Sequence, residues 1–385
     1  VKSNGTYNDS YLPEGLYRLT ATYSTQMSGV EIEINDVSPQ SIDFGETIVG
    51  QLSSITDVDK FSVVASTAGT ITLSFSSDES SGNEWDVQLL DSSNNLLSST
   101  VCGFSDCKSG ISVPVGIASP GTYTVNVKSN GTYNDSYLPE GLYRLTATQT
   151  AAIIQNGTTT IEDSFFAGML GLTSVTIPNS VTSIGSNAFY GTGLTSLVIP
   201  DSVQTIGIYS FYDAPIASLT IGKSLQEWSV HPDYGAFHNI CNTLTSLDIS
   251  ALKIPDSAFS GCSKLASLTL GDTVTEIGSS SFSSVSALTS VTIPSSVTSI
   301  GSGAFYGASA LTAITIPDSV TVLGGGAFSR ASSLESATLG NGITGISDSL
   351  FYGAIKLTSI VIPDTVTSIG SNAFYGTGLT SLVIP

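Results

Sequence analysis

The chain has 385 residues, few charges and a strong acidic excess: 31 Asp and Glu against 11 Lys and Arg, a net charge of −20. Binding to nucleic acid or to anionic lipid depends on Lys and Arg, so the composition argues against both kinds of partner. No apolar run reaches the roughly 18 residues of a membrane-spanning helix, so we expect no membrane insertion.

Both ends of the chain repeat sequence found inside it. Residues 1–22 recur letter for letter at 127–148, and residues 366–385 repeat 181–200. Self-similarity of this kind is typical of arrays whose units support one another. We therefore expect residues 1–22 to be the end of a preceding copy of the module that follows. We also expect the chain to be a window of a long tandem-repeat protein.

Short alternating segments separated by turn residues fill residues 23–148, a spacing typical of an antiparallel β-sandwich. The segments are 61–66, 69–77, 85–93, 110–117, 121–129 and 141–148. Within them the series DVDKF, WDVQLLD, PGTYTVNV and GLYRLTAT resembles the bacterial pre-peptidase C-terminal domain. The resemblance implies a jelly-roll-like sandwich of the kind appended to secreted enzymes and surface proteins.

An acidic stretch, EIEIND at 31–36, precedes the first of these segments. In calcium-dependent relatives of the pre-peptidase C-terminal domain, an E-x-E-x-N-D stretch supplies calcium ligands together with nearby Asp residues. The resemblance thus implies a Ca²⁺ site made of Glu31, Glu33, Asn35, Asp36, Asp57 and Asp59. Several charged oxygens suit a hard cation. The alternative is an edge strand whose carboxylates are solvated, followed by an Asn-Asp turn.

From residue 149 to 385 the chain falls into units of 21–28 residues, of which LTSVTIPSSVTSIGSGAFYGASA at 288–310 is the clearest. Each unit holds two short β-like runs, ended by Pro or Gly. Apolar residues at positions 1, 4 and 6 should point inward, and Ser or Thr at 2, 3 and 5 outward. The leading residues are Leu172, Leu194, Ile216, Leu244, Leu265, Leu288, Leu311, Leu334, Leu357 and Leu379.

The core of this pattern, I-P-x-x-V-x-x-I-G-x-x-A-F, resembles the BspA-type leucine-rich repeats over roughly 151–385. The resemblance implies a mainly β protein in which about ten coils stack into a solenoid with parallel strands. Members of that family are typically cell-surface adhesins or interaction scaffolds. The A-F pair of these units, as in Ala304-Phe305, Ala327-Phe328 and Ala373-Phe374, should fill the core beside the next coil.

One unit, 216–243, is stretched to 28 residues by an insertion at 225–240. The insertion gathers Trp228, His231, Tyr234 and His238, which makes it a candidate contact site on an otherwise flat solenoid. The alternative is a loop that packs Trp228 back onto the core.

The four cysteines form two close pairs. Cys102 and Cys107 bracket a short loop, and Cys241 and Cys262 each stand three residues before the leading Leu of the next unit. Equivalent positions in adjacent coils lie about 4.8 Å apart, within reach of a disulfide. Two disulfides would indicate an oxidising, extracellular location, whereas the alternative is four buried thiols.

Nothing in the sequence indicates an enzyme. Both histidines lie in the insertion, with no G-x-S-x-G motif near them. The solenoid is poor in the paired carboxylates of glycosidases. His231, His238 and Cys241 make a loose zinc set that a disulfide would disrupt.

We therefore predict a non-enzymatic extracellular or cell-surface protein with a structural, filament-forming or adhesive role. Its partners would be other copies of itself or neighbouring modules of the same array. The alternative is specific recognition of a host or matrix protein or a glycan, through the solenoid face or the 225–240 insertion. A lesser alternative is ice binding by ladders of threonine.

Overall fold

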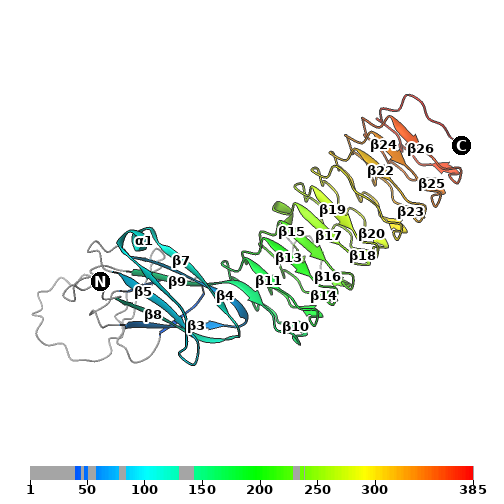
Figure 1. Cartoon of the computed structure of the whole chain (residues 1–385). Coiled ribbons are helices and arrows are strands. Elements are labelled where there is room, and N and C mark those ends of the chain that lie inside the picture. The colour runs from blue at the N-terminus through cyan, green and yellow to red at the C-terminus, as the bar shows by residue number, and fades with distance from the viewer. Residues whose placement is uncertain are drawn as a thin grey trace, which may run out of the picture.

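The computed structural model describes residues 40–44, 47–50, 58–77, 84–129, 143–228, 235–237 and 239–384. These residues form a β-sandwich followed by a rod of stacked coils (Figure 1). The helices of the described part are short: α1 (Phe104–Ser109) and the 3₁₀ helix η1 (Ile240–Asn242). The structure thus confirms the predicted fold class of a mainly β chain. Residues 1–22, expected to end a preceding sandwich, lie outside the described residues.

Two sheets make up the sandwich, with strand orders β1-β3-β8-β5-β6 and β11-β9-β4-β7, and β2 also pairs with β9. Pairs are antiparallel except for β1 with β3 and β11 with β9. The strands are β1 (Gln40–Ile42), β2 (Thr47–Gly50), β3 (Val58–Ala65), β4 (Ala68–Ser77), β5 (Trp85–Leu90), β6 (Leu96–Cys102), β7 (Ile111–Ile117), β8 (Gly121–Ser129) and β9 (Tyr143–Ile153).

Alternate residues of these strands point into the space between the two sheets. At the centre Phe75, Trp85 and Tyr143 pack with ring centroids 5.4–5.6 Å apart, and all three are buried. The six segments expected from the sequence correspond to β3, β4, β5, β7, β8 and β9. β6 was not expected, because its apolar residues do not alternate: Leu96 and Leu97 are both exposed.

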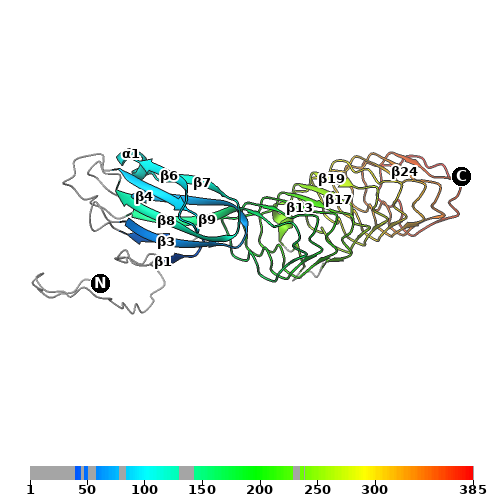
Figure 2. The ribbon, with the colours of Figure 1, turned by 60° about the horizontal axis from the view of Figure 1, so that its bottom comes forward.

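Two columns of short parallel strands run along the rod (Figure 1), and Figure 2 shows strands of the first column from another side. The first contains β11 (Ser174–Thr176), β13 (Ser196–Ile199), β15 (Ser218–Ile221), β17 (Ser246–Ile249), β19 (Ser267–Leu270), β22 (Ala313–Thr315), β24 (Ser336–Thr338) and β26 (Ser359–Val361). The second contains β10 (Thr160–Ile161), β12 (Ser183–Ile184), β14 (Thr205–Ile206), β16 (Glu227–Trp228), β18 (Lys253–Ile254), β20 (Glu276–Ile277), β21 (Ser299–Ile300), β23 (Val322–Leu323), β25 (Gly345–Ile346) and β27 (Ser368–Ile369).

The core of the rod is built from the same positions in every coil. The leading residues from Leu172 to Leu357 are fully buried, as the sequence pattern predicted. One phenylalanine per coil adds a continuous ladder, with neighbouring ring centroids 5.0–6.4 Å apart. The ladder consists of Phe166, Phe189, Phe211, Phe237, Phe259, Phe282, Phe305, Phe328, Phe351 and Phe374. These ten rings mark ten coils in the described part of the rod.

Successive coils touch at a glycine that directly follows six of the strands of the second column, among them β21 and β23. A Cβ placed on Gly301 would lie 2.4 Å from the backbone nitrogen of Ser279 in the preceding coil, and one on Gly324 would lie 2.3 Å from that of Ser302. No side chain fits in that space, because the obstacle is backbone. Gly303 is different: its φ of 63° is the reason for glycine there, and other coils place Asn187 or Ser280 at the same position.

These two glycines of one coil should therefore respond differently to substitution. We expect Gly301→Ala to destabilise the rod by about 3 kcal/mol, because the new methyl group must push two coils apart. Gly303→Asn should change stability by less than about 0.5 kcal/mol, because Asn tolerates the left-handed conformation. Urea denaturation followed by circular dichroism measures both. Equal losses for the two variants would contradict the tight contact at Gly301.

The sandwich and the rod share one strand. β9 pairs antiparallel with β4 along its length, and its last residues pair parallel with β11, the first strand of the rod's first column. A bulge in β9, opposite Thr70 and Ile71 of β4, separates the part of β9 that belongs only to the sandwich from the part that also pairs with the rod. The sequence boundary between residues 148 and 149 falls inside this strand. The end of β9 therefore acts as the first member of the rod's strand column.

At this junction Gln149 takes the place that a leading leucine holds in the coils. Its side chain is 1% exposed, and its Nε2 donates to Thr67 Oγ1 at 2.9 Å. The next residue, Thr150, accepts the backbone N–H of Thr173 at 3.0 Å, which is the contact that links one coil to the next farther along the rod. The glutamine thus ties the start of the rod to a sandwich loop.

Candidate functional site

The predicted calcium ligands are mostly beyond what the structure describes. Glu31, Glu33, Asn35, Asp36 and Asp57 lie outside the described residues. Asp59 lies on β3, is 3% exposed and accepts a hydrogen bond from the Tyr143 hydroxyl across the sandwich. No group of three or more His, Cys, Asp and Glu that could hold a metal occurs in the described part of the chain. The calcium site therefore stays a prediction.

Calcium should raise the melting temperature of the sandwich if the acidic stretch binds it, because a ligand that binds only the folded state stabilises that state. We expect Glu33→Gln to abolish the rise and Glu162→Gln, on the exposed surface of the rod, to preserve it. Differential scanning calorimetry in calcium and in chelator measures the effect. Identical melting curves in the two buffers would contradict the site.

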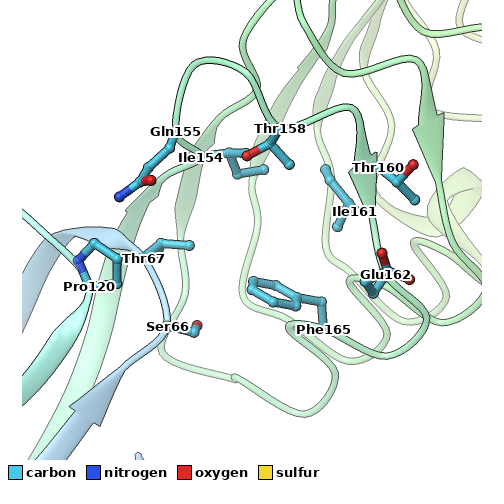
Figure 3. A pocket seen from close by; sticks show the side chains of 10 residues that line it. All are labelled: Ser66, Thr67, Pro120, Ile154, Gln155, Thr158, Thr160, Ile161, Glu162 and Phe165. Carbon is cyan, nitrogen blue, oxygen red and sulfur yellow. The ribbon is translucent and has the colours of Figure 1, made fainter.

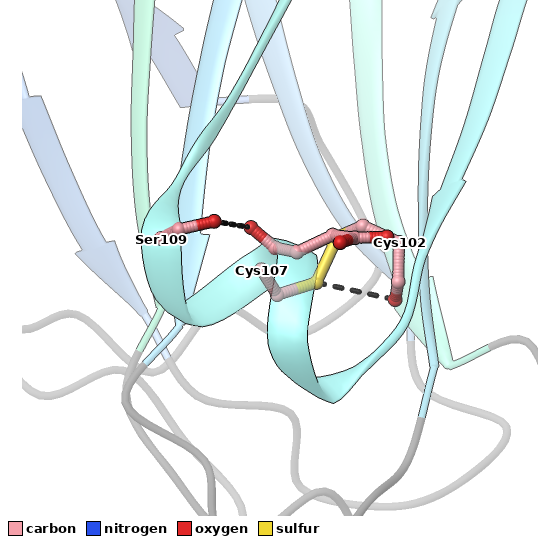
Figure 4. The surroundings of a disulfide bond; sticks show 4 residues. Cys102, Cys107 and Ser109 are labelled. Atoms are coloured by element: carbon pink, nitrogen blue, oxygen red, sulfur yellow. Dashed lines mark hydrogen bonds between the residues drawn. A yellow bond between two sulfur atoms is a disulfide. The ribbon is translucent and has the colours of Figure 1, made fainter.

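Both cysteine pairs form disulfides in the structure. Cys102–Cys107 joins the end of β6 to α1, where Ser109 Oγ donates to the carbonyl oxygen of Asp106 at 3.0 Å (Figure 4). Cys241–Cys262 links η1 to the following coil, with a Cα–Cα distance of 4.1 Å. This link lies where the Phe237–Phe259 step, at 6.4 Å, is the widest of the phenylalanine ladder. The second disulfide thus reinforces the stretched part of the rod.

No thiol should be labelled in the denatured protein before reduction, and all four cysteines should react after it. Removing Cys241–Cys262 with paired serine substitutions should lower the free energy of unfolding by about 3 kcal/mol, and removing Cys102–Cys107 should lower it by about 2 kcal/mol. The second value is smaller because Cys102–Cys107 closes the shorter loop. Thiol labelling with mass spectrometry and denaturation curves test the two statements. Labelling of all four cysteines without reduction would contradict them.

Trp228 does not belong to a surface contact site. It stands in β16 at the inward position that isoleucine fills in β14 and β18, and it is 7% exposed. Its ring packs against Phe237 and Phe259, with centroids 5.6 and 5.7 Å away. The large indole fills the space that the insertion opens in the core. Trp228 therefore packs back onto the core, as the second of the two interpretations of the insertion predicted. The other members of the predicted contact site, His231, Tyr234 and His238, lie outside the described residues.

A row of tyrosines along one edge of the rod was missed by the sequence analysis. They directly follow the core phenylalanine in several coils: Tyr190, Tyr212, Tyr306, Tyr352 and Tyr375. Tyr190 and Tyr212 stack at 5.2 Å, as do Tyr352 and Tyr375. The signal in the sequence is the recurring F-Y pair, which periodicity arguments ignore because the tyrosine lies outside the buried pattern.

Five aspartates of the rod serve its stacking. In several coils an Asp at a turn accepts a backbone N–H of the next coil, at 2.6–3.1 Å, as in Asp163, Asp201, Asp256, Asp318 and Asp348. The backbone N–H of Lys223, followed by its ammonium group, lowers the pKa of Asp201 below its ordinary value. Each of these groups is explained by a contact between coils rather than by chemistry on a substrate.

Many threonine hydroxyls have the same role. Thr182, Thr275 and Thr298, for example, donate to the carbonyl oxygen of the equivalent residue in the preceding coil. A second set, at the fifth position of the coil, is exposed and belongs to the flat face of the first strand column: Thr269, Thr292, Thr315 and Thr338. Val198, Asp248 and Val361 interrupt that set.

A small cavity of about 140 Å³ lies between the sandwich and the first coil (Figure 3). Its lining residues are Ser66, Thr67, Pro120, Ile154, Gln155, Thr158, Thr160, Ile161, Glu162 and Phe165. Glu162 is the one ionisable group in this lining. The lining holds serine and threonine hydroxyls but no His, Cys or Lys beside the carboxylate, so it does not present a recognisable catalytic set.

No helix in the described ranges is both long and apolar enough to cross a membrane.

Several solved structures resemble the chain. A leucine-rich repeat protein from Bacteroides ovatus is 26% identical over 60% of this chain and 60% of its own, with a TM-score of 0.44. A leucine rich cell surface protein from Faecalibacterium prausnitzii is 28% identical over 55% of this chain and 59% of its own, with a TM-score of 0.31. The chain therefore spans about three fifths of either protein.

One structural neighbour is of another kind. The pre-peptidase C-terminal domain of a Bacillus anthracis collagenase is 19% identical over 30% of this chain and 100% of its own, with a TM-score of 0.24. Among curated proteins no significant match is found.

The coil pattern also matches a described family. Six copies of the "BspA type Leucine rich repeat region" match residues 137–252 and 252–383, which together make up more than half of the chain. These residues are the ones that build the shared strand and the ten coils. The chain belongs to the BspA-type leucine-rich repeat family.

Proposed function

We propose that this chain is a rigid, non-enzymatic section of an extracellular surface protein, with a structural or adhesive role. The observation that supports the proposal best is the shared strand β9, which joins the sandwich to the coil stack through backbone pairing on both sides. Because β9 is hydrogen-bonded on both edges, to β4 of the sandwich and to β11 of the rod, no linker separates the two parts, and they project as one body. Such a body suits a spacer or stalk.

Two further observations support a location outside the cytoplasm. Disulfides persist in oxidising compartments, and the structure contains two of them. One of the similar structures is described as a leucine rich cell surface protein. We propose the same location here, with other copies or neighbouring modules of a tandem array as partners.

Immunogold electron microscopy of the producing cells tests this proposal. An antibody against residues 149–385 should label the surface of intact cells, and the label should lie on projecting rods or filaments. Permeabilised cells provide the control for antibody access. Labelling that occurs only after permeabilisation would contradict the proposed location, and label on isolated globular particles would contradict the proposed array.

Specific recognition is the second candidate, and the tyrosine edge favours it. Tyr190 is 40% exposed, and its ring stacks on Tyr212 one coil away, close to the insertion. Exposed stacked aromatic rings on a rigid scaffold are typical of contact surfaces. Ice binding has weaker support, because many threonine hydroxyls already donate to backbone carbonyls and the exposed threonine column is interrupted.

A further inference from the structure

In nine of the ten coils, the residue two positions before the core phenylalanine has the left-handed conformation. In the described coils this position is held by Ser164, Asn187, Tyr209, Ser257, Ser280, Gly303, Gly326, Ser349 and Asn372. Serine, asparagine and glycine are the residues that enter this conformation at low cost. Tyr209, with φ of 54°, is the exception.

The tyrosine at this position costs stability. A bulky side chain is disfavoured in the left-handed region, and the eight other coils show that the turn is satisfied by a small residue. Strain of this kind is found where a side chain is held in place for a function. The backbone turn therefore does not by itself account for a tyrosine at position 209.

Tyr209 belongs to a compact aromatic group that spans two coils. Its ring meets Tyr212 edge-on, with centroids 5.2 Å apart and an interplanar angle of 86°. Tyr212 in turn stacks on Tyr190 at 5.2 Å and 3°. We define the tyrosine patch as Tyr190, Tyr209 and Tyr212. The patch combines ring surface in two perpendicular orientations on a rigid edge.

Polar groups of a suitable kind flank the tyrosine patch. Asp213 follows Tyr212 directly, and Asn239 Nδ2 donates to Asp213 Oδ1 at 2.9 Å; both residues are exposed. A carboxylate accepts hydrogen bonds, and an amide both donates and accepts them. The patch and its two flanking residues contain no Lys or Arg, and the chain carries a net charge of −20. Anionic ligands are therefore disfavoured at this edge.

We propose that the tyrosine patch, with Asp213 and Asn239, binds a neutral glycan. The apolar C–H face of a pyranose ring packs against an aromatic ring, while its hydroxyl groups exchange hydrogen bonds with a carboxylate and an amide. An edge-on tyrosine beside a stacked pair cradles such a ring better than a single flat surface does. The inference deepens the recognition role proposed above and rests on it.

Substitutions separate this role from a structural one. Tyr209→Asn installs the residue that two other coils use at the same turn, so it should preserve or raise the melting temperature. If the patch binds a glycan, the same variant should weaken binding at least tenfold, and so should Tyr212→Ser. Tyr352→Ser is the matched control, because Tyr352 holds the position of Tyr212 in another coil and stacks on Tyr375. It should leave binding unchanged.

The probes are an array of neutral oligosaccharides, including cellohexaose, chitohexaose, mannohexaose and N-acetyllactosamine, with sialyllactose as the anionic comparator. Calorimetric titration of the full chain with the best array glycan then gives the affinity of each variant.

Three results would overturn the proposal: no neutral glycan binds, only sialyllactose binds, or Tyr209→Asn binds as well as the unmodified chain. A fall in melting temperature for Tyr209→Asn would also overturn it, by showing that the tyrosine is needed for folding. Surface labelling by the antibody together with a negative array would refute this inference alone and leave the proposed location standing.

Discussion

Each coil of the rod is completed by its neighbours, and the remainder of the structure depends on this. Strand donors face the preceding coil: the N–H of Gly301 donates to Ile277 at 2.7 Å. Turn donors face the following coil: the N–H of Phe305 donates to Ala327 at 2.8 Å. A coil on its own would leave both sets of backbone groups, and one face of its phenylalanine, to water. Stability therefore comes from the repetition of one interface rather than from any single coil.

The sandwich meets this requirement at the start of the rod. Residues at the end of β9 present to β11 the parallel backbone edge that a preceding coil would present. The same strand is anchored in the sandwich by its antiparallel pairing with β4. Gln149 shows the compromise at the junction, because a polar side chain bonded to Thr67 replaces the leucine of the regular coils. The sandwich thereby covers a surface that would otherwise be an open sheet edge.

How much of this could be predicted from the sequence differs between elements. The coil period, the buried leucines and the phenylalanine ladder follow from a repeating apolar pattern, because burial on one face is what that pattern records. The pairing of Cys241 with Cys262 follows from the same period. β6 escaped prediction because its leucines face outward, and the continuation of β9 into the rod escaped it because strand pairing is not encoded in alternation alone.

The candidate site was harder to predict than the fold. Trp228 could be assigned to the surface or to the core from its sequence position, and only its packing against Phe237 and Phe259 decides for the core. Tyr209 gave no signal in the pattern of apolar residues, because its distinguishing property is a backbone angle that appears only when the coils are compared in three dimensions. The acidic stretch at 31–36 lies outside the described residues, so its role as a calcium site stays a prediction.

The shared strand also fixes direction. Because β9 is hydrogen-bonded on both sides, the rod cannot swivel about its long axis relative to the sandwich without breaking a sheet. The edge that carries the tyrosines therefore keeps a fixed orientation relative to the sandwich. Wherever several such chains are attached in the same way through their sandwiches, their tyrosine-bearing edges will all face the same side.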